Sequence, residues 1–179
     1  ASLKGLSLVS DQSFDLTVLV NNAGTLGPVK PSYKASWEEI DHCITLNTSS
    51  ARLRSATFLS EVTGEKQIYF TGSGAAAYAI EGWSAYCASK AAVHMYAEVL
   101  AKEHPGNRIH AFMPGKVNTP MQAEIRATST EDFPDVVHFV EEFESGNLVL
   151  PETVASTLLR VVEMEAEIPV IFSISNYTT

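Results

Sequence analysis

The stretch LTVLVNNAG at residues 16–24 joins a short apolar, β-rich run to a pair of amides and a glycine. The run from Leu16 to Val20 is too short for a helix, and its nearly continuous apolar character is typical of a strand buried in a parallel sheet. Three further runs share these properties, at residues 67–71, 108–113 and 168–174. The sequence therefore predicts four buried parallel strands.

Longer stretches with a helical spacing of apolar residues separate these runs. The first begins with Ser36 and Glu39 at the spacing of a capping box, and the third has Pro151 in its first turn, where proline is tolerated. Strands that alternate with helices predict an α/β fold. The predicted helices cover residues 36–62, 84–103 and 151–164.

Residues 114–150 form the longest connection between predicted elements, and they contain Pro114, Gly115, Pro120 and Gly146. Connections of this length inside a compact domain are often lids or binding loops. We therefore expect residues 114–150 to be a substrate-binding loop region.

The composition predicts one globular domain. The chain has 179 residues, of which 45% are apolar and 18% charged, which is enough to bury a core within a single domain over residues 1–179. Nucleic-acid binding relies on clustered lysine and arginine, and a formal net charge of −9 argues against it. We expect no nucleic-acid partner.

Cysteine spacing and the length of apolar runs bear on the cellular compartment. The two cysteines, Cys43 and Cys87, have no CxxC spacing and no nearby histidine pair, so neither a zinc site nor a disulfide framework is indicated. No apolar run approaches the roughly 18 residues of a membrane span, and the first residues do not resemble a signal peptide. We expect a cytoplasmic protein with no metal site and no membrane partner.

The predicted helix 84–103 is apolar on nearly every side. Packing on a sheet covers only one face of a helix, so the other face needs a second cover. We favour a partner subunit as that cover, although the alanines and tyrosines are also compatible with simple core packing. We therefore expect a homodimer through residues 36–62 and 84–103.

Tyr86 and Lys90 are candidates for chemistry because residues four apart on a helix project from one face. Ser73 follows the predicted strand 67–71, and the sequence Asn-Asn-Ala-Gly at 21–24 follows the first strand. Both segments are expected at the carboxyl ends of strands, where ligands bind in open α/β sheets.

In order and spacing, these motifs resemble the short-chain dehydrogenase/reductase family, which also has an asparagine in the helix before the serine, and Pro114-Gly115 with Thr119 after a later strand. Within the family, the chain is most similar to sepiapterin reductase and to fungal members that reduce diketones. This closer likeness is carried by residues 21–27, Gly82-Trp83, Tyr86-Cys87-Ala88, Thr119 to Gln122, and Arg126.

The resemblance implies a Rossmann-like, doubly wound parallel sheet and a carbonyl reductase that uses NADP, or alternatively NAD, on a small ketone or diketone. By this resemblance Tyr86 is the general acid, and Lys90 with the oxidised nicotinamide lowers the pKa of its phenol from about 10. Ser73 orients and polarises the substrate carbonyl, and Asn47 holds a water that connects Lys90 to solvent. Among the apolar residues of its predicted helix, Asn47 is oddly placed unless its carboxamide has a partner.

The resemblance also implies residues for the cofactor and the substrate pocket. Its cofactor-binding residues are Asn22, Ala23 and Gly24 on the adenosine side, Pro114, Gly115 and Val117 at the nicotinamide carboxamide, Thr119 beside the phosphates, and the pair Tyr86 and Lys90. Trp83 and Met121 resemble residues of the substrate pocket, although an aromatic residue or a methionine is equally compatible with a core position.

Two family features do not occur in residues 1–179. Complete members open with a turn of the form Thr-Gly-x-x-x-Gly-x-Gly that holds the pyrophosphate, and Leu8 to Asp11 resembles at best the family's third strand. We therefore expect the N-terminal strands to be missing or incomplete, which leaves an apolar edge at residues 16–20. Residues 170–173 lack the acid with which sepiapterin reductase grips a pterin, and this argues against a pterin substrate.

The alternative function is that of a truncated, non-catalytic homologue that acts as a binding or scaffold protein. The presence of Asn47, Ser73, Tyr86 and Lys90 together argues against it, because such a protein has no physical need for all four.

Overall fold

A computed structural model describes residues 14–178 of the protein. Its sheet has four strands in the order β1-β2-β3-β4, and every neighbouring pair is parallel. The strands are β1 (Leu16–Asn21), β2 (Glu65–Thr71), β3 (Arg108–Met113) and β4 (Ile171–Ser173). The predicted α/β class is confirmed. β4 is shorter than predicted, because Pro169 has no N–H to donate and Ile174 already belongs to a 3-10 turn.

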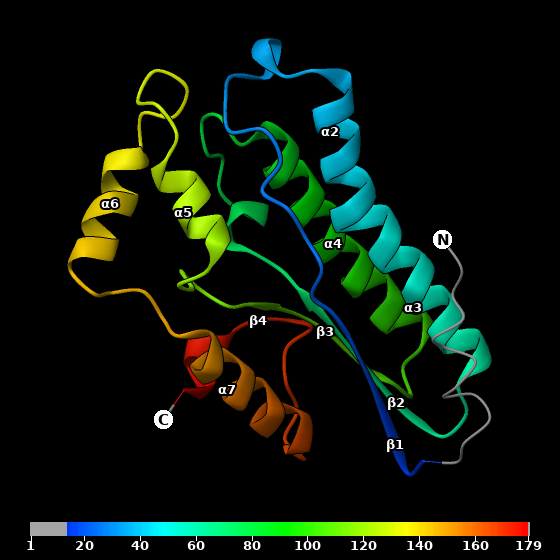
Figure 1. The fold of residues 1–179 in the computed structure, drawn as a ribbon. Helices are drawn as coiled ribbons and strands as arrows, with labels where there is room; N and C mark the ends of the chain where they lie inside the picture. The colour runs from blue at the N-terminus through cyan, green and yellow to red at the C-terminus, as the bar shows by residue number, and fades with distance from the viewer. Residues whose placement is uncertain (1–13, 179) are drawn as a thin grey trace.

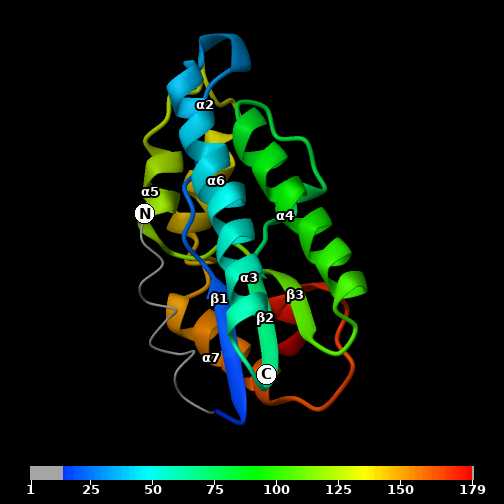
Figure 2. The same ribbon diagram turned by 90° about the vertical axis from the view of Figure 1, so that its right-hand side faces the viewer.

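Helices cover both faces of the sheet (Figure 1). On one face, α2 (Trp37–Ile44) and α3 (Ser50–Glu61) run on as one long rod beside α4 (Ser84–Glu103), as Figure 2 shows. On the other face lies α7 (Pro151–Glu163).

Alternation along the strands builds a core on each side of the sheet. Ile68 and Phe70 of β2 pack toward α3 and α4, whereas Tyr69 packs against Leu158 and Val161 of α7. Helices on both faces of an all-parallel sheet confirm the predicted Rossmann-like, doubly wound architecture.

The helices α2 and α7 begin where the sequence predicted. At the start of α2, the Ser36 hydroxyl accepts from Glu39 N at 3.2 Å, and Glu39 Oε2 accepts from Ser36 N at 2.8 Å. This is the predicted capping box, which satisfies two free N–H groups at once. α7 begins at Pro151, whose missing N–H is not needed in a first turn.

The prediction of one regular helix over residues 36–62 is wrong at one turn. Between α2 and α3, residues Thr45–Ser49 form a π-helical turn, in which Ser50 N donates to Thr45 O. The extra residue in such a turn widens the helix locally, and π turns occur mainly at functional sites. Here the turn holds Asn47.

The segment 114–150 is not the loop that the sequence predicted, because it contains two helices, α5 (Pro120–Arg126) and α6 (Val136–Glu144). Pro120 takes the first helical position, where proline favours a helix rather than breaking it. The segment folds back on itself through an isolated parallel bridge between Val117 and Val149. Both helices lie beyond one end of the sheet (Figure 1).

β1 forms one edge of the described sheet, where it pairs with β2 alone. Leu16 is 37% exposed and Val20 is 42% exposed, which agrees with the predicted apolar edge. The segment from Leu8 to Asp11 lies outside the described residues. Among residues 14–178, no helix has both the length and the apolar character needed to cross a membrane.

Candidate active site

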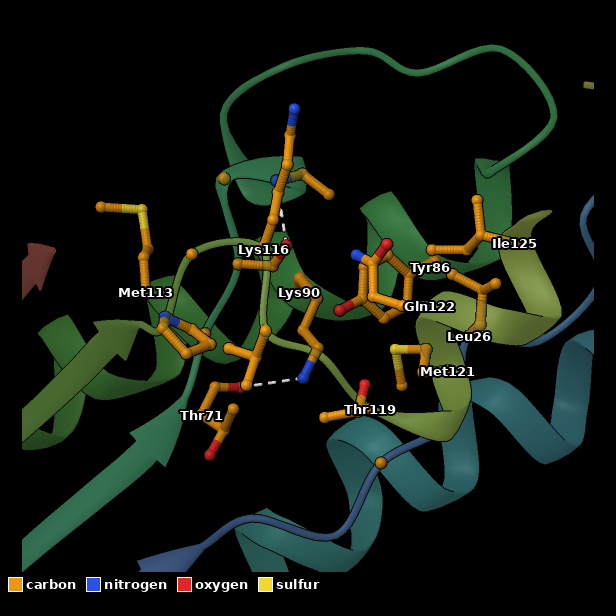
Figure 3. Close-up of a pocket in the computed structure, with 18 of the residues that line it drawn as sticks. Leu26, Thr71, Tyr86, Lys90, Met113, Lys116, Thr119, Met121, Gln122 and Ile125 are labelled. Atoms are coloured by element: carbon orange, nitrogen blue, oxygen red, sulfur yellow. Dashed lines mark hydrogen bonds between the residues drawn. The ribbon is translucent and has the colours of Figure 1, made fainter. Parts of the chain in front are cut away.

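A cavity of about 810 Å³ lies where the strands end. Asn22 follows β1, Ser73 follows β2 and Pro114 follows β3, and all three line the cavity together with Ser173 at the end of β4. Tyr86 and Lys90 of α4 and residues of α5 also line the cavity (Figure 3), and α6 contributes Phe139. The carboxyl ends of the parallel strands thus meet at one site, as the sequence predicted.

Ser73, Tyr86 and Lys90 form what we term the polar wall of this cavity. Tyr86 and Lys90 lie one turn apart on α4 and are 7% and 5% exposed. Lys90 Nζ donates to Thr71 O at 2.8 Å, the contact drawn in Figure 3, and lies 5.5 Å from the centre of the Tyr86 ring. The α4 helix therefore ties its lysine to the end of β2 and presents the tyrosine beside it.

Burial sets the charge states in the polar wall. It lowers the pKa of Lys90 from 10.5 to about 8, because a buried ammonium loses its hydration. For the same reason, burial raises the pKa of the Tyr86 phenol above 10, while the Ser73 hydroxyl partly opposes this shift. The lowering of this pKa that the resemblance implies depends on the oxidised nicotinamide as well as on Lys90, and it stays a prediction. The phenol is protonated at neutral pH, which is the form that a proton donor needs.

Ser73 is fixed by the turn that it begins. It caps the 3-10 turn Gly74–Ala76, and its Oγ accepts from Ala75 N at 3.2 Å. A serine hydroxyl both accepts and donates, so its proton stays available to a ligand in the cavity.

Asn47 has the partners that its apolar surroundings demand. Its Oδ1 accepts from Thr25 N at 2.8 Å, and its Nδ2 donates to Thr25 O and to Ser89 Oγ, each at 2.9 Å. A Cβ at Gly24 would lie 3.2 Å from Asn47 Oδ1 and 3.7 Å from Lys90 Nζ. Asn47 therefore fixes the segment after β1 close to the polar wall, although its own side chain does not line the cavity.

The residues expected to bind a nucleotide are brought together at the strand ends, with one exception. Ala23 does not line the cavity. Gly115 has φ +83°, a left-handed conformation that favours glycine, and no neighbouring atom lies within 4 Å of the position that a Cβ would take. The residues of this set that do line the cavity are Asn22, Gly24, Tyr86, Lys90, Pro114, Gly115, Val117 and Thr119.

The cavity also has an apolar wall, which we define as Trp83, Met121, Ile125 and Phe139 and which adjoins the polar wall at Tyr86. The Trp83 ring stands perpendicular to the Tyr86 ring at 5.6 Å between centres and lies 5.5 Å from Phe139. Trp83 and Met121 both line the cavity, and their contact with a substrate stays a prediction. Residues 14–178 contain no cluster of three or more side chains suited to a metal ion.

Comparison with known proteins places this geometry in a family. The family model described as short chain dehydrogenase matches residues 4–130 of the chain. The chain belongs to the short-chain dehydrogenase family. Enzymes of this family are oxidoreductases that use NAD or NADP.

Several curated short-chain dehydrogenases resemble this one. Benzil reductase from Bacillus cereus is 36% identical over 168 residues, which cover 89% of this chain and 67% of that enzyme. The benzil reductase of Bacillus subtilis is 34% identical over 96% of this chain and 74% of its own length. Bovine sepiapterin reductase is 33% identical over 82% of this chain and 57% of its own length. The predicted likeness to benzil-reducing members and to sepiapterin reductase is confirmed, and both of these benzil reductases are bacterial.

Solved short-chain dehydrogenases share the fold. The KRED1-Pglu enzyme superposes with a TM-score of 0.86 at 24% identity, over 94% of this chain and 72% of the other. A short-chain dehydrogenase/reductase from Saccharomyces cerevisiae superposes equally well, at 22% identity, over 97% of this chain and 73% of its own.

Two residues of this short-chain dehydrogenase site were not assigned a role from the sequence. Gln122 lines the cavity from α5 and is 8% exposed, and its Oε1 has no hydrogen-bond partner in the described part of the chain. His94 lies one turn beyond Lys90 on α4 and accepts from Ser73 N at 3.4 Å. The spacing of Tyr86, Lys90 and His94, each four residues from the next, is the sequence signal that places His94 on the same helix face.

Proposed function

We propose that this protein is an NADP-dependent carbonyl reductase that reduces a ketone or diketone to an alcohol, with Tyr86 as general acid. The observation that carries the proposal is the convergence of Ser73, Tyr86 and Lys90 on one cavity whose other wall is apolar. The names of the related benzil and sepiapterin reductases support a small-molecule carbonyl substrate.

The strand ends fit a nicotinamide nucleotide. At Gly24 a side chain would fill the space toward Lys90, so glycine lets a ligand approach the backbone there. The open space at Gly115 serves a second part of the ligand in the same way. When bound, NADPH supplies the hydride to the carbonyl carbon. We propose NADP as the nucleotide and NAD as the alternative, with Asn22, Ala23, Gly24, Pro114, Gly115, Val117 and Thr119 as its contacts.

Two hydroxyl groups act on the substrate's carbonyl oxygen. Ser73 donates a hydrogen bond that orients the carbonyl and stabilises negative charge as it develops. Tyr86 then transfers its phenolic proton to the same oxygen, so the C=O double bond becomes a CH–OH group. The raised pKa of Tyr86 keeps this proton in place at neutral pH until the oxygen becomes basic.

Lys90 and Asn47 support this transfer. Below a pH of about 8, Lys90 carries a positive charge near the Tyr86 ring, and this charge stabilises the phenolate that the transfer leaves. The Oδ1 atom of Asn47 accepts one hydrogen bond from Thr25 N and retains a second acceptor position. This position suits the water that would connect Lys90 to solvent, the source that replaces the proton given up by Tyr86.

The apolar wall indicates the substrate class. Trp83 and Phe139 both line the cavity, and aromatic groups pack well against aromatic rings. At the end of β4 the cavity is lined by Ser173 rather than by an acid. We therefore propose an aromatic ketone or diketone, and not a pterin, as the substrate.

We also propose that the protein is a homodimer through residues 36–62 and 84–103. Leu53 on α3 and Met95 on α4 are each 59% exposed, and Val99 is exposed on the same helix. Because large apolar side chains on neighbouring helices favour association, a two-fold contact between these helices is the expected arrangement. Light scattering at micromolar concentration tests it, and a strictly monomeric mass contradicts it.

We propose the cytoplasm as the site of action. Both Cys43 and Cys87 are free thiols, which suits a reducing compartment, and a supply of reduced nicotinamide nucleotide is required there.

A direct assay tests the proposed activity. The purified protein is mixed with NADPH and benzil, and the loss of NADPH absorbance is followed while chromatography identifies the alcohol. We expect benzil to be reduced faster with NADPH than with NADH, and sepiapterin to react poorly. A protein that binds NADPH but reduces no aromatic ketone or diketone contradicts the proposal.

A further inference from the structure

The side chain of His94 touches the strand end that carries the polar wall. It lies on α4, one turn after Lys90 and two turns after Tyr86, and only 8% of it is exposed. Its Nε2 accepts a hydrogen bond from the backbone N–H of Ser73, with 3.4 Å between the nitrogens. This is the one partner that the Ser73 amide has among residues 14–178.

The ring of His94 is seated directly against the strand backbone. A Cβ added to Gly72 would collide with His94 Nε2 and would lie 3.0 Å from its Cδ2, so only glycine allows the ring to come this close. The backbone conformation does not require glycine at position 72, because Gly72 is not among the glycines with positive φ. Glycine at this position therefore serves the contact with His94.

Three successive residues at the end of β2 are each anchored by a different contact. Lys90 Nζ donates to Thr71 O at 2.8 Å, Gly72 N donates to Phe112 O at 2.8 Å, and Ser73 N donates to His94. The first and third anchors come from α4, the helix that also carries Tyr86. The spacing between the Ser73 and Tyr86 hydroxyls thus depends on two side chains of one helix.

We propose that His94 is a positioning residue, which acts as a neutral hydrogen-bond acceptor that fixes Ser73 opposite Tyr86. This inference rests on the proposed carbonyl reduction, in which both hydroxyls meet one oxygen. An acceptor at Nε2 requires the proton of the neutral ring to sit on Nδ1. Protonation adds an N–H at Nε2 that faces the Ser73 N–H, so the anchor is lost when the ring becomes charged.

The surroundings of His94 keep its ring neutral. Burial is the main cause that lowers its pKa below 6.5, and the positive charge of Lys90 lowers it further, while Glu98 on α4 raises it by less. Gly72, the residue after β2 that packs against the ring, carries no charge. The neutral form is therefore the competent form at pH 7, and activity is expected to fall as pH drops through the lowered pKa.

The test compares His94→Leu, which removes the acceptor, with His94→Gln, whose side-chain oxygen can take the place of Nε2. With NADPH and benzil, we expect kcat to fall about 10-fold to 100-fold in His94→Leu with KM changed less than about threefold, since a slight displacement of a catalytic group is costly. His94→Gln should recover most of this loss and should flatten the acid limb of the kcat profile. His104→Gln, at the end of the same helix, is the matched control.

A readout without activity separates this inference from the proposed function. Hydrogen exchange of the Ser73 amide, followed by NMR, should be at least about tenfold faster in His94→Leu than in the unaltered protein and near normal in His94→Gln. Circular dichroism checks that both variants fold. If His94→Leu does not fold, the test uses the unaltered protein instead, in which protection of the Ser73 amide should fall as His94 becomes protonated. Unchanged exchange in His94→Leu, or protection of the Ser73 amide relative to an unstructured amide that stays constant across the histidine titration, overturns the inference even if the enzyme reduces no ketone. Equal loss of kcat in both variants also overturns it.

Discussion

The two walls of the cavity are built by different forces. The polar wall of Ser73, Tyr86 and Lys90 is fixed by hydrogen bonds between α4 and the end of β2. The apolar wall is fixed by contacts among rings such as Trp83 and Phe139, and its one side-chain N–H, Trp83 Nε1, has no partner among residues 14–178. Hydrogen bonds fix direction, which proton transfer needs, whereas ring packing fixes shape.

This difference predicts a division of labour. Because every substrate presents the same carbonyl group to the polar wall, changes in that wall should lower kcat for all substrates alike. The apolar wall meets the part in which substrates differ, so changes there should alter the ranking of substrates. Four substitutions test this division, given from the largest expected effect to the smallest.

Tyr86→Phe should have the largest effect. It removes the proton donor and keeps the ring that packs against Trp83, so kcat should fall by at least about 10² to 10⁴ for benzil and for small ketones alike. The thermal midpoint should stay within a few degrees. Steady-state rates and calorimetry measure both, and a variant with unaltered kcat refutes the role of Tyr86.

Lys90→Met should separate activity from stability. We expect kcat to fall about 10²-fold, since the charge that stabilises the phenolate is lost. The native state binds fewer protons than the unfolded state between pH 8 and 10.5, because the pKa of Lys90 is lowered to about 8. The free energy of unfolding of the unaltered protein should therefore rise with pH in this window. Below pH 8 the buried, charged Lys90 lowers the free energy of unfolding by the full amount.

Urea unfolding of Lys90→Met provides the corresponding measurement. The variant should lose this pH dependence and, at pH 7, should gain up to roughly 3 kcal/mol, the equivalent of the lowered pKa. A less stable variant at pH 7 would mean that the bond to Thr71 O outweighs the cost of the buried charge.

Phe139→Leu should act on the apolar wall alone. The smaller side chain removes a ring that faces Trp83, so KM for benzil should rise about threefold to tenfold. The kcat for a small aliphatic diketone should stay within about twofold. If both substrates lose kcat equally, the two walls are not separable in this way.

Gln122→Leu should have the smallest effect. Its Oε1 is buried and has no partner among residues 14–178, so an apolar replacement should leave stability unchanged or slightly higher. If the carboxamide contacts the second oxygen of a diketone, kcat/KM for benzil should fall about twofold relative to a monoketone. Parallel assays of the two substrates measure this ratio, and an unaltered ratio excludes such a contact.

The two walls also differ in how well they could be predicted from sequence. Helix 84–103 and strand 108–113 were predicted with the bounds that the structure shows, because a continuous apolar pattern ends sharply at Pro105-Gly106 between them. The motif with Tyr86 and Lys90 lies on that helix, so the polar wall followed from spacing and from the family resemblance.

The apolar wall was predicted less well because α5 and α6 are short helices of seven and nine residues. Pro120 at the start of α5, with Pro134 and Gly146 on either side of α6, resembles a loop signal when tertiary packing is unknown. The π turn that carries Asn47 was also missed, since one extra residue per turn leaves no mark in composition. His94 and Gln122 were missed because their roles depend on contacts with segments distant in sequence.

The bridge between Val117 and Val149 has an evolutionary consequence. Asn118 N donates to Val149 O at 2.8 Å, and Val149 N donates to Lys116 O at 2.9 Å. The two ends of the segment that contains α5 and α6 are therefore held side by side. An insertion, deletion or exchange between these two ends leaves the register of the strands unchanged. Selection can therefore change substrate preference by replacing this one segment. Chimeras that exchange residues 118–148 between relatives offer a direct route to new specificities.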